Sequence, residues 1–463
     1  MFKTVKPKIK NLSAEIISFL RKYPLAAYLF KFGLIFTLFW IVAYYSLDPD
    51  FGWHLQSGNY ILKNWIPSHD IFTYTARNFR WINIEWLNDV FVSIFYKLGG
   101  YLLLSIIFAC IWTASLAIAC FRTRMWILLL ASLSLLPFVG IRPIAWTMLA
   151  LAILIKLINQ KTKLSYLLIF LLFLIWANLH GGFVIGFLVI LIAAIQQKNP
   201  KLLILLLACF AVSLVNPYGA AMYIEVRRTL TDSSLHSQIT EWQSFALKPI
   251  TWNYIVLYFA GFWLFSRSKI KNWLTLGPIL FAASLVACRN YPLFVIATLG
   301  GLNKYFSKIK NLLPKKMLQS QKIIIWIFCI AIVGWSIYWA DTFFIGLAQS
   351  PNNLIVISDY LNDHKCAGNL FNDYDLGGYL IWKVPSQPVF IDGRMPSWRD
   401  PSGQKYLDTY FSVINGKVWQ SVFTKYNITC AVINKKSALE SKLVQHNWQI
   451  ATENGTYVVL SKP

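Results

Sequence analysis

The sequence predicts a polytopic α-helical membrane protein that carries a small polar α/β domain at its C-terminus. Hydrophobic residues make up 57% of the chain and aromatic residues 16%, which is far more apolar surface than a water-soluble fold can bury. Apolar runs recur from about residue 29 to residue 340, and the hydropathy falls only after about residue 350. A soluble protein is therefore excluded.

The basic residues indicate how the chain is oriented in the membrane. The formal net charge is +24, which in a soluble protein would indicate a nucleic-acid partner. Here the Lys and Arg residues lie mainly in short connections between apolar runs, where they hold loops on the cytoplasmic side. The charge therefore predicts topology, and we expect no nucleic-acid partner.

The N-terminal segment, residues 1–27, is basic and predicts a cytoplasmic start. No small-residue cleavage site follows the first apolar run, so we expect a retained signal-anchor span over residues 29–47. This span runs outward and brings Asp48 to the outer face. The first outer loop, residues 48–89, mixes Trp residues with polar ones, and we expect short helices that lie in the membrane interface.

Further apolar runs follow, and with the first they predict about 11 spans, several of them shorter than the roughly 20 residues that a bilayer requires. Alternate threading places most of the connecting Lys and Arg residues in the cytoplasm and gives an N-in, C-out topology. The transmembrane module then covers residues 28–345, with a second large outer loop at residues 216–251. The later runs cover residues 91–120, 125–139, 143–158, 164–178, 181–196, 202–215, 252–266, 273–288, 291–302 and 323–340.

The polar tail, residues 346–463, predicts a small α/β domain outside the cytoplasm. Strand-like runs at residues 369–371, 388–391, 429–433 and 456–460 alternate with helix-like segments. Of the seven cysteines, only Cys366 and Cys430 lie in this tail, and the others occupy apolar runs without a metal-ligand spacing. We expect two unpaired buried thiols, which are the commoner case, and the alternative is a disulfide between the two if the domain is extracytoplasmic.

The uncommon polar residues of the membrane part all fall on the outer side of this topology. Charges at membrane depth are costly and usually line a cavity or pathway, so their convergence at one level predicts a site. Simpler interpretations stay open, because an Asp can cap a helix, an Arg can reach lipid headgroups, and Asn216-Pro-Tyr-Gly can be only a turn. The residues concerned are Asp48, Asp50, His54 and Glu85 in the first outer loop, and Arg142, His180, Asn216, Glu241 and Arg289 in later ones.

With these residues the chain resembles the GT-C superfamily of membrane glycosyltransferases, which use a polyprenyl-phosphate-linked sugar as donor. It is most similar to a bacterial branch with Asp-x-Asp-x-x-Trp-His-Leu-x-x-Gly in its first loop, here Asp48, Asp50, Trp53, His54, Leu55 and Gly58. The tail segment from Asp375 to Trp382 distantly resembles part of oligosaccharyltransferase catalytic subunits. Other matching positions are Glu85-Trp86-Leu87, Arg142-Pro143, His180-Gly181-Gly182, Asn216-Pro217, Arg289, Gly377-Gly378-Tyr379 and Ile391-Asp392-Gly393-Arg394.

The resemblance implies an inverting transfer of a hexose or pentose to an acceptor hydroxyl, in the bacterial inner membrane with the site facing outward. A carboxylate would remove the acceptor proton. Asp50 is the first choice for this base, because it lies one step further from the span and beside Trp53 and His54, and Asp48 is the second choice or an orienting partner. Other members often place two acids side by side, whereas Pro49 separates them here, so which acid takes the family role is open. Arg289, Arg142 and His180 would hold the donor phosphate. Sugar or acceptor contacts are expected from His54, Trp53, Glu85, Glu241, Asn216, Asp392, Arg394 and Tyr379.

The resemblance implies no required cofactor, although acids beside a His are also compatible with Mg²⁺ or Mn²⁺. The acceptor, whether a glycan, a lipid or a protein, is open. In the tail, Asp392 and Arg394 can instead be an ion pair that holds the domain together. Other function classes are a transporter or flippase, which would need polar residues at mid-membrane depth, an O-antigen ligase or polymerase with its site in a late outer loop, and a non-catalytic scaffold.

Overall fold

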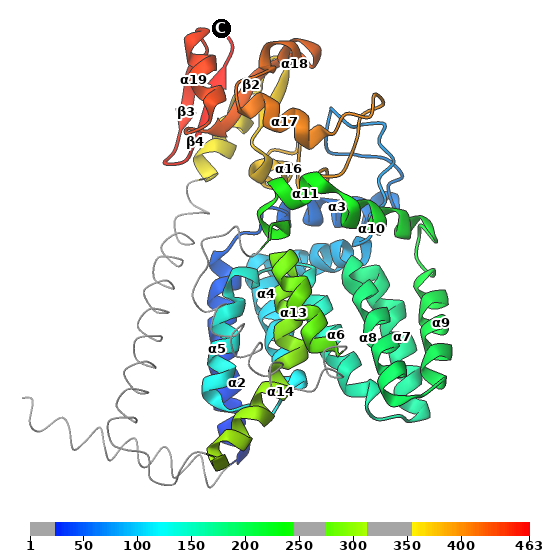
Figure 1. The fold of residues 1–463 in the computed structure, drawn as a ribbon. Coiled ribbons are helices and arrows are strands. Elements are labelled where there is room, and N and C mark those ends of the chain that lie inside the picture. Colours follow the sequence, from blue (N-terminus) through cyan, green and yellow to red (C-terminus); the bar gives the residue numbers. More distant parts are fainter. Residues whose placement is uncertain (1–23, 245–274, 313–353) are drawn as a thin grey trace, which may run out of the picture.

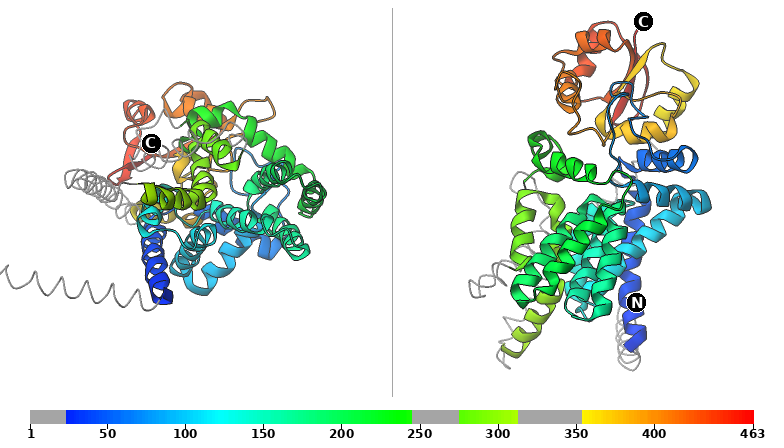
Figure 2. Two further views of the ribbon diagram at one scale, coloured as in Figure 1. Left: turned by 60° about the horizontal axis from the view of Figure 1, so that its bottom comes forward. Right: turned by 90° about the vertical axis from the view of Figure 1, so that its right-hand side faces the viewer.

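The computed structural model describes residues 24–244, 275–312 and 354–463. A helical bundle stands below an α/β domain, and short helices form a layer between the two (Figures 1 and 2). Most of the predicted segment 1–27 and the predicted spans 252–266 and 323–340 lie outside the described residues. The span count and the N-in, C-out orientation therefore stay predictions.

Apolar helices build the bundle, because the hydrophobic surface of each one can be covered only by its neighbours or by lipid. Aromatic side chains such as Phe108, Trp112 and Trp176 fill the interior and are at most 1% exposed. Two described helices, Leu25–Tyr45 and Trp86–Ala119, are long and apolar enough to cross a membrane, and further apolar helices are shorter. The bundle consists of α2 (Pro24–Tyr45), α4 (Trp86–Ala119), α5 (Met125–Leu135), η1 (Leu136–Phe138), α6 (Ile144–Ile158), α7 (Lys163–Leu179), η2 (Gly181–Phe183), α8 (Val184–Gln197), α9 (Lys201–Ser213), α13 (Leu276–Val286) and α14 (Tyr291–Leu312).

Most of the described helices match the predicted spans, but the predicted span 91–120 differs. Helix α4 begins at Trp86 and is interrupted at Gly99 and Gly100, where Gly100 has a φ of 63°. A positive φ is unfavourable for residues with a side chain, so this Gly-Gly pair ends one helical segment and starts another. The segment before the break packs along α3 (Phe51–Asn64), and the two lie across the upper end of the bundle (Figure 2).

The C-terminal domain contains a mixed four-stranded sheet in the order β1-β2-β4-β3. Strand β1 (Asn369–Asn372) runs parallel to β2 (Ile428–Asn434), and β4 (Tyr457–Ser461) is antiparallel to both β2 and β3 (Gln449–Glu453). The predicted strands 369–371, 429–433 and 456–460 are confirmed, whereas β3 was not predicted. The helical elements are η7 (Tyr374–Leu376), α16 (Gly377–Lys383), α17 (Tyr406–Ile414), α18 (Trp419–Lys425) and α19 (Ala438–Gln445), preceded by a helix over residues 354–363.

The predicted strand 388–391 is not part of this sheet and pairs with the first outer loop instead. Val389 forms a parallel β-bridge with Thr73. The Val389 N–H donates to the Phe72 carbonyl at 3.2 Å, and the Tyr74 N–H donates to the Val389 carbonyl at 3.3 Å. Loop side chains also belong to the buried core of the C-terminal domain, namely Trp53, Ala76 and Trp81. The loop that the sequence places in the transmembrane module therefore folds together with the tail.

Helix α16 packs backbone to backbone against the start of α3. A Cβ atom added to Gly378 would overlap the carbonyl oxygen of Pro49, and one added to Gly52 would overlap the carbonyl oxygen of Gly378. The Phe51 ring meets the Trp382 ring edge to face, with centroids 5.2 Å apart. Only glycine permits such a close approach of two backbones. This contact fixes the start of α3 between the bundle and the C-terminal domain.

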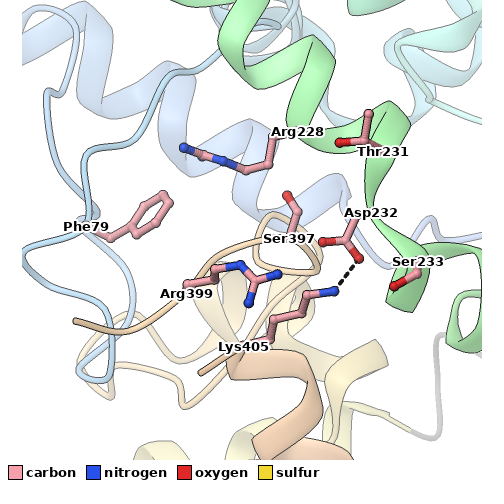
Figure 3. Close-up of a pocket in the computed structure, with 8 residues that line it drawn as sticks. All are labelled: Phe79, Arg228, Thr231, Asp232, Ser233, Ser397, Arg399 and Lys405. Carbon is pink, nitrogen blue, oxygen red and sulfur yellow. Dashed lines mark hydrogen bonds and ion pairs between the residues drawn. The ribbon is translucent and has the colours of Figure 1, made fainter. Parts of the chain in front are cut away.

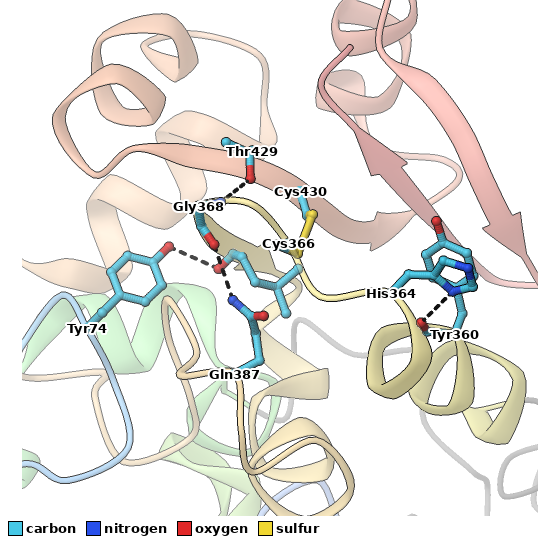
Figure 4. The surroundings of a disulfide bond; sticks show 9 residues. Tyr74, Tyr360, His364, Cys366, Gly368, Gln387, Thr429 and Cys430 are labelled. Atoms are coloured by element: carbon cyan, nitrogen blue, oxygen red, sulfur yellow. Dashed lines mark hydrogen bonds between the residues drawn. A yellow bond between two sulfur atoms is a disulfide. The ribbon is translucent and has the colours of Figure 1, made fainter.

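A disulfide joins Cys366, which precedes β1, to Cys430 in β2, with their Cα atoms 5.8 Å apart (Figure 4). Beside it, the Gly368 N–H donates a hydrogen bond to Thr429 Oγ1 at 2.7 Å (Figure 4). The expectation of unpaired thiols is therefore wrong, and the structure has the alternative, the disulfide. The bond closes a chain segment with a sequence separation of 64 and ties the first strand of the sheet to its centre.

Candidate active site

Polar side chains converge where the bundle, α3 and the C-terminal domain meet. They come from the two ends of the first outer loop, the turn before α6, the end of α7, and the short helices η3 (Thr240–Trp242) and η6 (Cys288–Asn290). Ion pairs and mutual electrostatic effects connect these side chains. We call them the acid–imidazole cluster, whose members are Asp48, Asp50, His54, Glu85, Asp89, Arg142, His180, Glu241 and Arg289.

Asp50 occupies the N-cap position of α3, but its side chain does not cap the helix. The Trp53 indole N–H donates to Asp50 Oδ1 at 2.9 Å instead. The carboxyl group is half-buried, and within the described part of the chain it forms no ion pair. Burial, followed by the charge of Asp48, raises the pKa of Asp50 to about 7. A Cβ atom at Gly393 would overlap this carboxylate, so the C-terminal domain covers one side of it.

The Asp48 carboxylate, unlike that of Asp50, is paired with a cation. It is 7% exposed and forms an ion pair with the Arg142 guanidinium, and its Oδ1 accepts a hydrogen bond from the Asp50 N–H at 2.8 Å. Arg142 Nη1 also donates to Glu241 Oε1 at 2.7 Å. Burial opposes the charge of Arg142, but Asp48 and Glu241 outweigh it and raise the pKa of this guanidinium. Asp48 and Arg142 therefore hold each other and the start of α3.

His54 is paired with a carboxylate that the sequence did not single out. Its Nδ1 lies 2.6 Å from Oδ1 of Asp89, which is fully buried in the first turn of α4. The other oxygen, Asp89 Oδ2, accepts a hydrogen bond from Asn83 Nδ2 at 2.7 Å. Burial opposes the charge of the imidazole, but Asp89, Glu85 and Asp50 raise the pKa of His54 to about 9. His54 is therefore an imidazolium at neutral pH.

Glu85 lies between the two histidines of the cluster, at 3.8 Å from His54 Nε2 and 3.4 Å from His180 Nε2. Burial raises the pKa of Glu85 to about 7. His180 Nδ1 accepts the Gly182 N–H at 3.1 Å and lies 2.7 Å from Thr147 Oγ1. Because a backbone N–H can only donate, the ring proton of His180 is on Nε2, which faces Glu85. Burial and the charges of Arg289 and His54 lower the pKa of His180 to about 3.

Arg289 differs from the other cations of the cluster, because it forms no ion pair with a carboxylate of the described residues. Its guanidinium stacks on the Trp242 ring at 4.1 Å from the centroid. Glu241, Glu85 and Asp50 are near enough to affect its pKa, which burial lowers. Because no ion pair occupies this guanidinium in the part of the chain that the structure describes, its planar N–H donors can bind an anionic ligand.

Asp392 and Arg394 lie beside the cluster but face the first outer loop. Arg394 donates to Asp392 through Nε at 2.8 Å and Nη2 at 2.6 Å, and its Nη2 also lies 2.7 Å from Asp70 Oδ1. All three side chains are almost fully buried, and the guanidinium lies 4.5 Å from the Trp81 ring centroid. This buried triad joins the C-terminal domain to the loop. Asp392 and Arg394 therefore form an ion pair with a structural role, which was the alternative to sugar or acceptor contacts.

Asn216 and Tyr379 are not brought into the cluster. The Asn216 amide donates to the carbonyls of Ser213 and Gly219 and accepts the Tyr218 N–H at 2.8 Å, so it stabilises its own turn. Tyr379 is 5% exposed, and its hydroxyl lies 3.2 Å from Ser358 Oγ inside the C-terminal domain. Both side chains are engaged in local structure.

Sequence reasoning missed several polar residues that support the site, among them Asp89, Asn83 and Thr147. All three are buried. Asp89 and Asn83 hold His54 through the contacts described above, and Thr147 contacts His180. The spacing of Asp89 four residues after Glu85, at the start of an apolar helix, is a signal that could have found it. Asn83 carries no comparable signal, because its role depends on the folded path of the loop.

The cluster contains no preformed metal site among the described residues, where no group of three His, Cys, Asp or Glu side chains is arranged to hold an ion. Asp48 is engaged by Arg142, and Asp89 is engaged by His54 and Asn83. Mg²⁺ or Mn²⁺ prefers several oxygen ligands, so these engaged carboxylates do not fit that donor set.

No protein-family model and no curated protein matches this chain. Among solved structures, the chain is similar to the crystal structure of the Archaeoglobus fulgidus oligosaccharyltransferase tethered to an acceptor peptide that contains the NVT sequon. The match covers 90% of this chain and 70% of that chain, with a TM-score of 0.55 and 12% sequence identity. This chain therefore has a GT-C-like fold, as the sequence predicted.

Proposed function

We propose that this protein is a membrane glycosyltransferase of a bacterial GT-C branch, which transfers a hexose or pentose from a polyprenyl-phosphate donor to an acceptor hydroxyl with inversion. The shared fold supports the enzyme class. The observation that carries the chemistry is Asp50, a half-buried carboxyl group with a pKa of about 7 that neither caps its helix nor forms an ion pair within the described residues. A general base is most effective when its pKa lies near the working pH.

In the proposed reaction, Asp50 accepts the proton of the acceptor hydroxyl while the hydroxyl oxygen attacks the anomeric carbon. The bond from that carbon to the donor phosphate oxygen breaks on the opposite side, and its electron pair leaves with the polyprenyl phosphate. Arg289 binds this phosphate and stabilises the charge that develops on it. One glycosidic bond replaces another, and the proton remains on Asp50 until it passes to solvent.

The other cluster members position these two groups. Asp48 and Arg142 hold the turn before α3, and Trp53 orients the Asp50 carboxylate through its indole N–H. His54, held by Asp89, places a positive charge beside Glu85, which is then available to bind sugar or acceptor hydroxyls. His180 is neutral, so we assign it to hydrogen bonding and not to charge neutralisation of the phosphate.

The cellular side of the reaction is part of the proposal. Disulfides form and persist in oxidising compartments, so the Cys366–Cys430 bond supports an extracytoplasmic C-terminal domain. The same domain covers Asp50 through Gly393, which would place the site on the outer face of the membrane. Lipid-linked sugars are the donors that such a site would use.

Replacement of Asp50 tests this proposal. The purified Asp50→Asn protein is expected to fold normally and to lose transfer from polyprenyl-phosphate hexoses by about 100-fold or more, the usual contribution of a general base. Asp363→Asn is the matched control, because Asp363 is an exposed acid of the C-terminal domain. Equal transfer by both variants would contradict the assignment, and size-exclusion chromatography of each checks that it is folded.

A further inference from the structure

A polar cavity lies on the side of the short-helix layer that faces the C-terminal domain. It is lined by residues of α10 (Ala221–Thr231), the start of α11 (Ser233–Gln238), the chain from Ser397 to Lys405, and Phe79 of the first outer loop (Figure 3). Its volume is ≈ 280 Å³. Sites for drug-sized ligands usually have about 300–1,000 Å³, so this cavity suits one small group.

The lining of the cavity is positively charged. Arg228, Arg399 and Lys405 face it together with one carboxylate, Asp232, which Lys405 Nζ binds at 2.7 Å (Figure 3). Arg228 Nη1 lies 2.6 Å from Glu225 Oε2. Arg399 is exposed and donates through Nη1 to a backbone carbonyl at 2.8 Å, and it forms no ion pair within the described part of the chain. The cavity therefore presents an excess of guanidinium donors, which match the geometry of carboxylate and phosphate oxygens.

The rest of the lining suits a sugar ring. The hydroxyl groups of Ser233 and Ser397 can each donate and accept hydrogen bonds, and the Thr231 hydroxyl, which donates to the Arg227 carbonyl at 2.9 Å, can accept one. The Phe79 ring is stacked on the Trp398 ring, with centroids 4.3 Å apart, and the Arg228 guanidinium lies over the Phe79 ring at 5.4 Å from its centroid. Phe79 therefore offers the cavity its ring edge and holds Arg228 in place. The hydroxyl groups around the edge of a saccharide have counterparts in the hydroxyl groups of this cavity.

Two short chain segments connect the cavity to the acid–imidazole cluster. Gly393 packs on the Asp50 carboxylate, and Ser397, four residues further along, lines the cavity. Four extended residues span at most about 14 Å, so the cavity lies close to the proposed base. On the other side, the chain that leaves Asp232 continues through α11 to Glu241, which binds Arg142. The cavity and the acid–imidazole cluster are therefore built on the same two chain segments.

We propose that this cavity is an acceptor subsite that binds a negatively charged saccharide unit, with Arg399 and Arg228 on its carboxylate or phosphate group, the cavity hydroxyls on its own hydroxyl groups, and Phe79 holding Arg228 in place. This inference rests on the proposed glycosyltransferase function, because it names the class of acceptor. The position between α10 and the C-terminal domain, away from the apolar bundle, favours a water-soluble group over the headgroup of the lipid donor (Figure 1).

Binding measured on the full chain in detergent tests the subsite. We expect glucuronic acid or glucose 6-phosphate to bind at least tenfold more tightly than glucose in isothermal titration, and the charged sugar that binds identifies the anionic group. Arg399→Gln and Phe79→Ala should each weaken this binding by tenfold or more. Lys436→Gln is the matched control, because Lys436 is an exposed cation on another part of the same domain.

Equal affinities for glucose and both charged sugars would overturn the charge assignment, and inorganic phosphate binding as tightly as glucose 6-phosphate would overturn the saccharide assignment. Absence of binding by all of these probes would overturn the subsite itself. The titration contains no donor, so its result is independent of transfer. If glucose and the charged sugars bind equally but transfer still depends on Asp50, only the subsite is refuted. If the charged sugars bind specifically but transfer does not depend on Asp50, the proposed function is refuted.

Discussion

Single residues in the acid–imidazole cluster have distinct tasks because their surroundings differ. Asp48 and Asp50 are two positions apart, yet Asp48 is bound to the charged Arg142, while the Asp50 carboxylate accepts a hydrogen bond from the neutral Trp53 indole and has a pKa of about 7. The two histidines differ in the same way, with pKa values of about 9 for His54 and about 3 for His180. Environments that separate the pKa values of similar groups are typical of sites with assigned acid and base roles.

The buried pair of His54 and Asp89 makes a testable contribution to stability. Removing one partner of a buried ion pair typically costs about 3–5 kcal/mol, so we expect Asp89→Asn to lower the thermal midpoint clearly. His54→Gln combined with Asp89→Asn should cost less than the sum of the single changes. Glu453→Gln breaks an exposed ion pair with Lys435 and should cost about 1 kcal/mol or less. Additive effects of the His54 and Asp89 substitutions would show that the two residues are not coupled.

The pH dependence of this pair follows from the direction of the His54 shift. The folded state raises the pKa of His54 to about 9, so the stabilisation is fully present below its unfolded value of about 6.5. It is lost as the pH rises through about 9, where the folded protein releases the proton. Wild-type protein should therefore lose part of its stability between these values, and a protein with both substitutions should lose less.

Predictability from sequence differed sharply among these residues. Asp48, Asp50, His54 and Glu85 could be selected because polar groups at the end of an apolar span are uncommon. Asn83 could not be selected, because no local sequence pattern shows that an Asn in a loop will be buried. Arg142 was assigned to phosphate, and only the folded structure reveals that Asp48 and Glu241 already bind it.

Glycine residues allow the backbones of α16 and the start of α3 to approach each other closely. Gly378 of α16 lies against the Pro49 carbonyl, directly before Asp50. Gly378→Ala should therefore force α16 away from α3, at a cost of about 1–3 kcal/mol, and reduce transfer because Asp50 moves. Limited proteolysis should cut the C-terminal domain of this variant faster. Gly455→Ala, at a position with no neighbouring atom within 4 Å, should behave as wild type, and equal behaviour of both variants would contradict the role of the contact.

Helix positions were predictable where the apolar pattern is uninterrupted, as in α6 and α7. The break in α4 was not predicted, although Gly99-Gly100 lies in the middle of the run, because apolar residues continue on both sides. The pairing of residues 388–391 with the loop at Thr73 was also beyond local reasoning. It joins segments far apart in the sequence, and a strand pattern does not identify its partner.

On the scale of the whole molecule, the disulfide and the shared core hold the C-terminal domain on the first outer loop. Replacing Cys366 and Cys430 together by Ala should destabilise the domain by about 4 kcal/mol, as expected for a loop of this length. Thermal unfolding measures the change, and Cys110→Ala in the bundle is the control. Alkylation of intact membranes should find both tail cysteines blocked. Two reactive thiols there would contradict an extracytoplasmic domain.

The most direct test of the central claim is the pH profile of transfer from a polyprenyl-phosphate hexose. Asp50 acts as a base only when it is ionised, and its raised pKa means that the active form is lost as the pH falls below about 7. We expect kcat/KM to rise about tenfold per pH unit up to about 7 and then to level off. The Asp50→Asn protein should show no such rise and almost no transfer. Wild-type rates in that variant, with the same profile, would contradict Asp50 as the base.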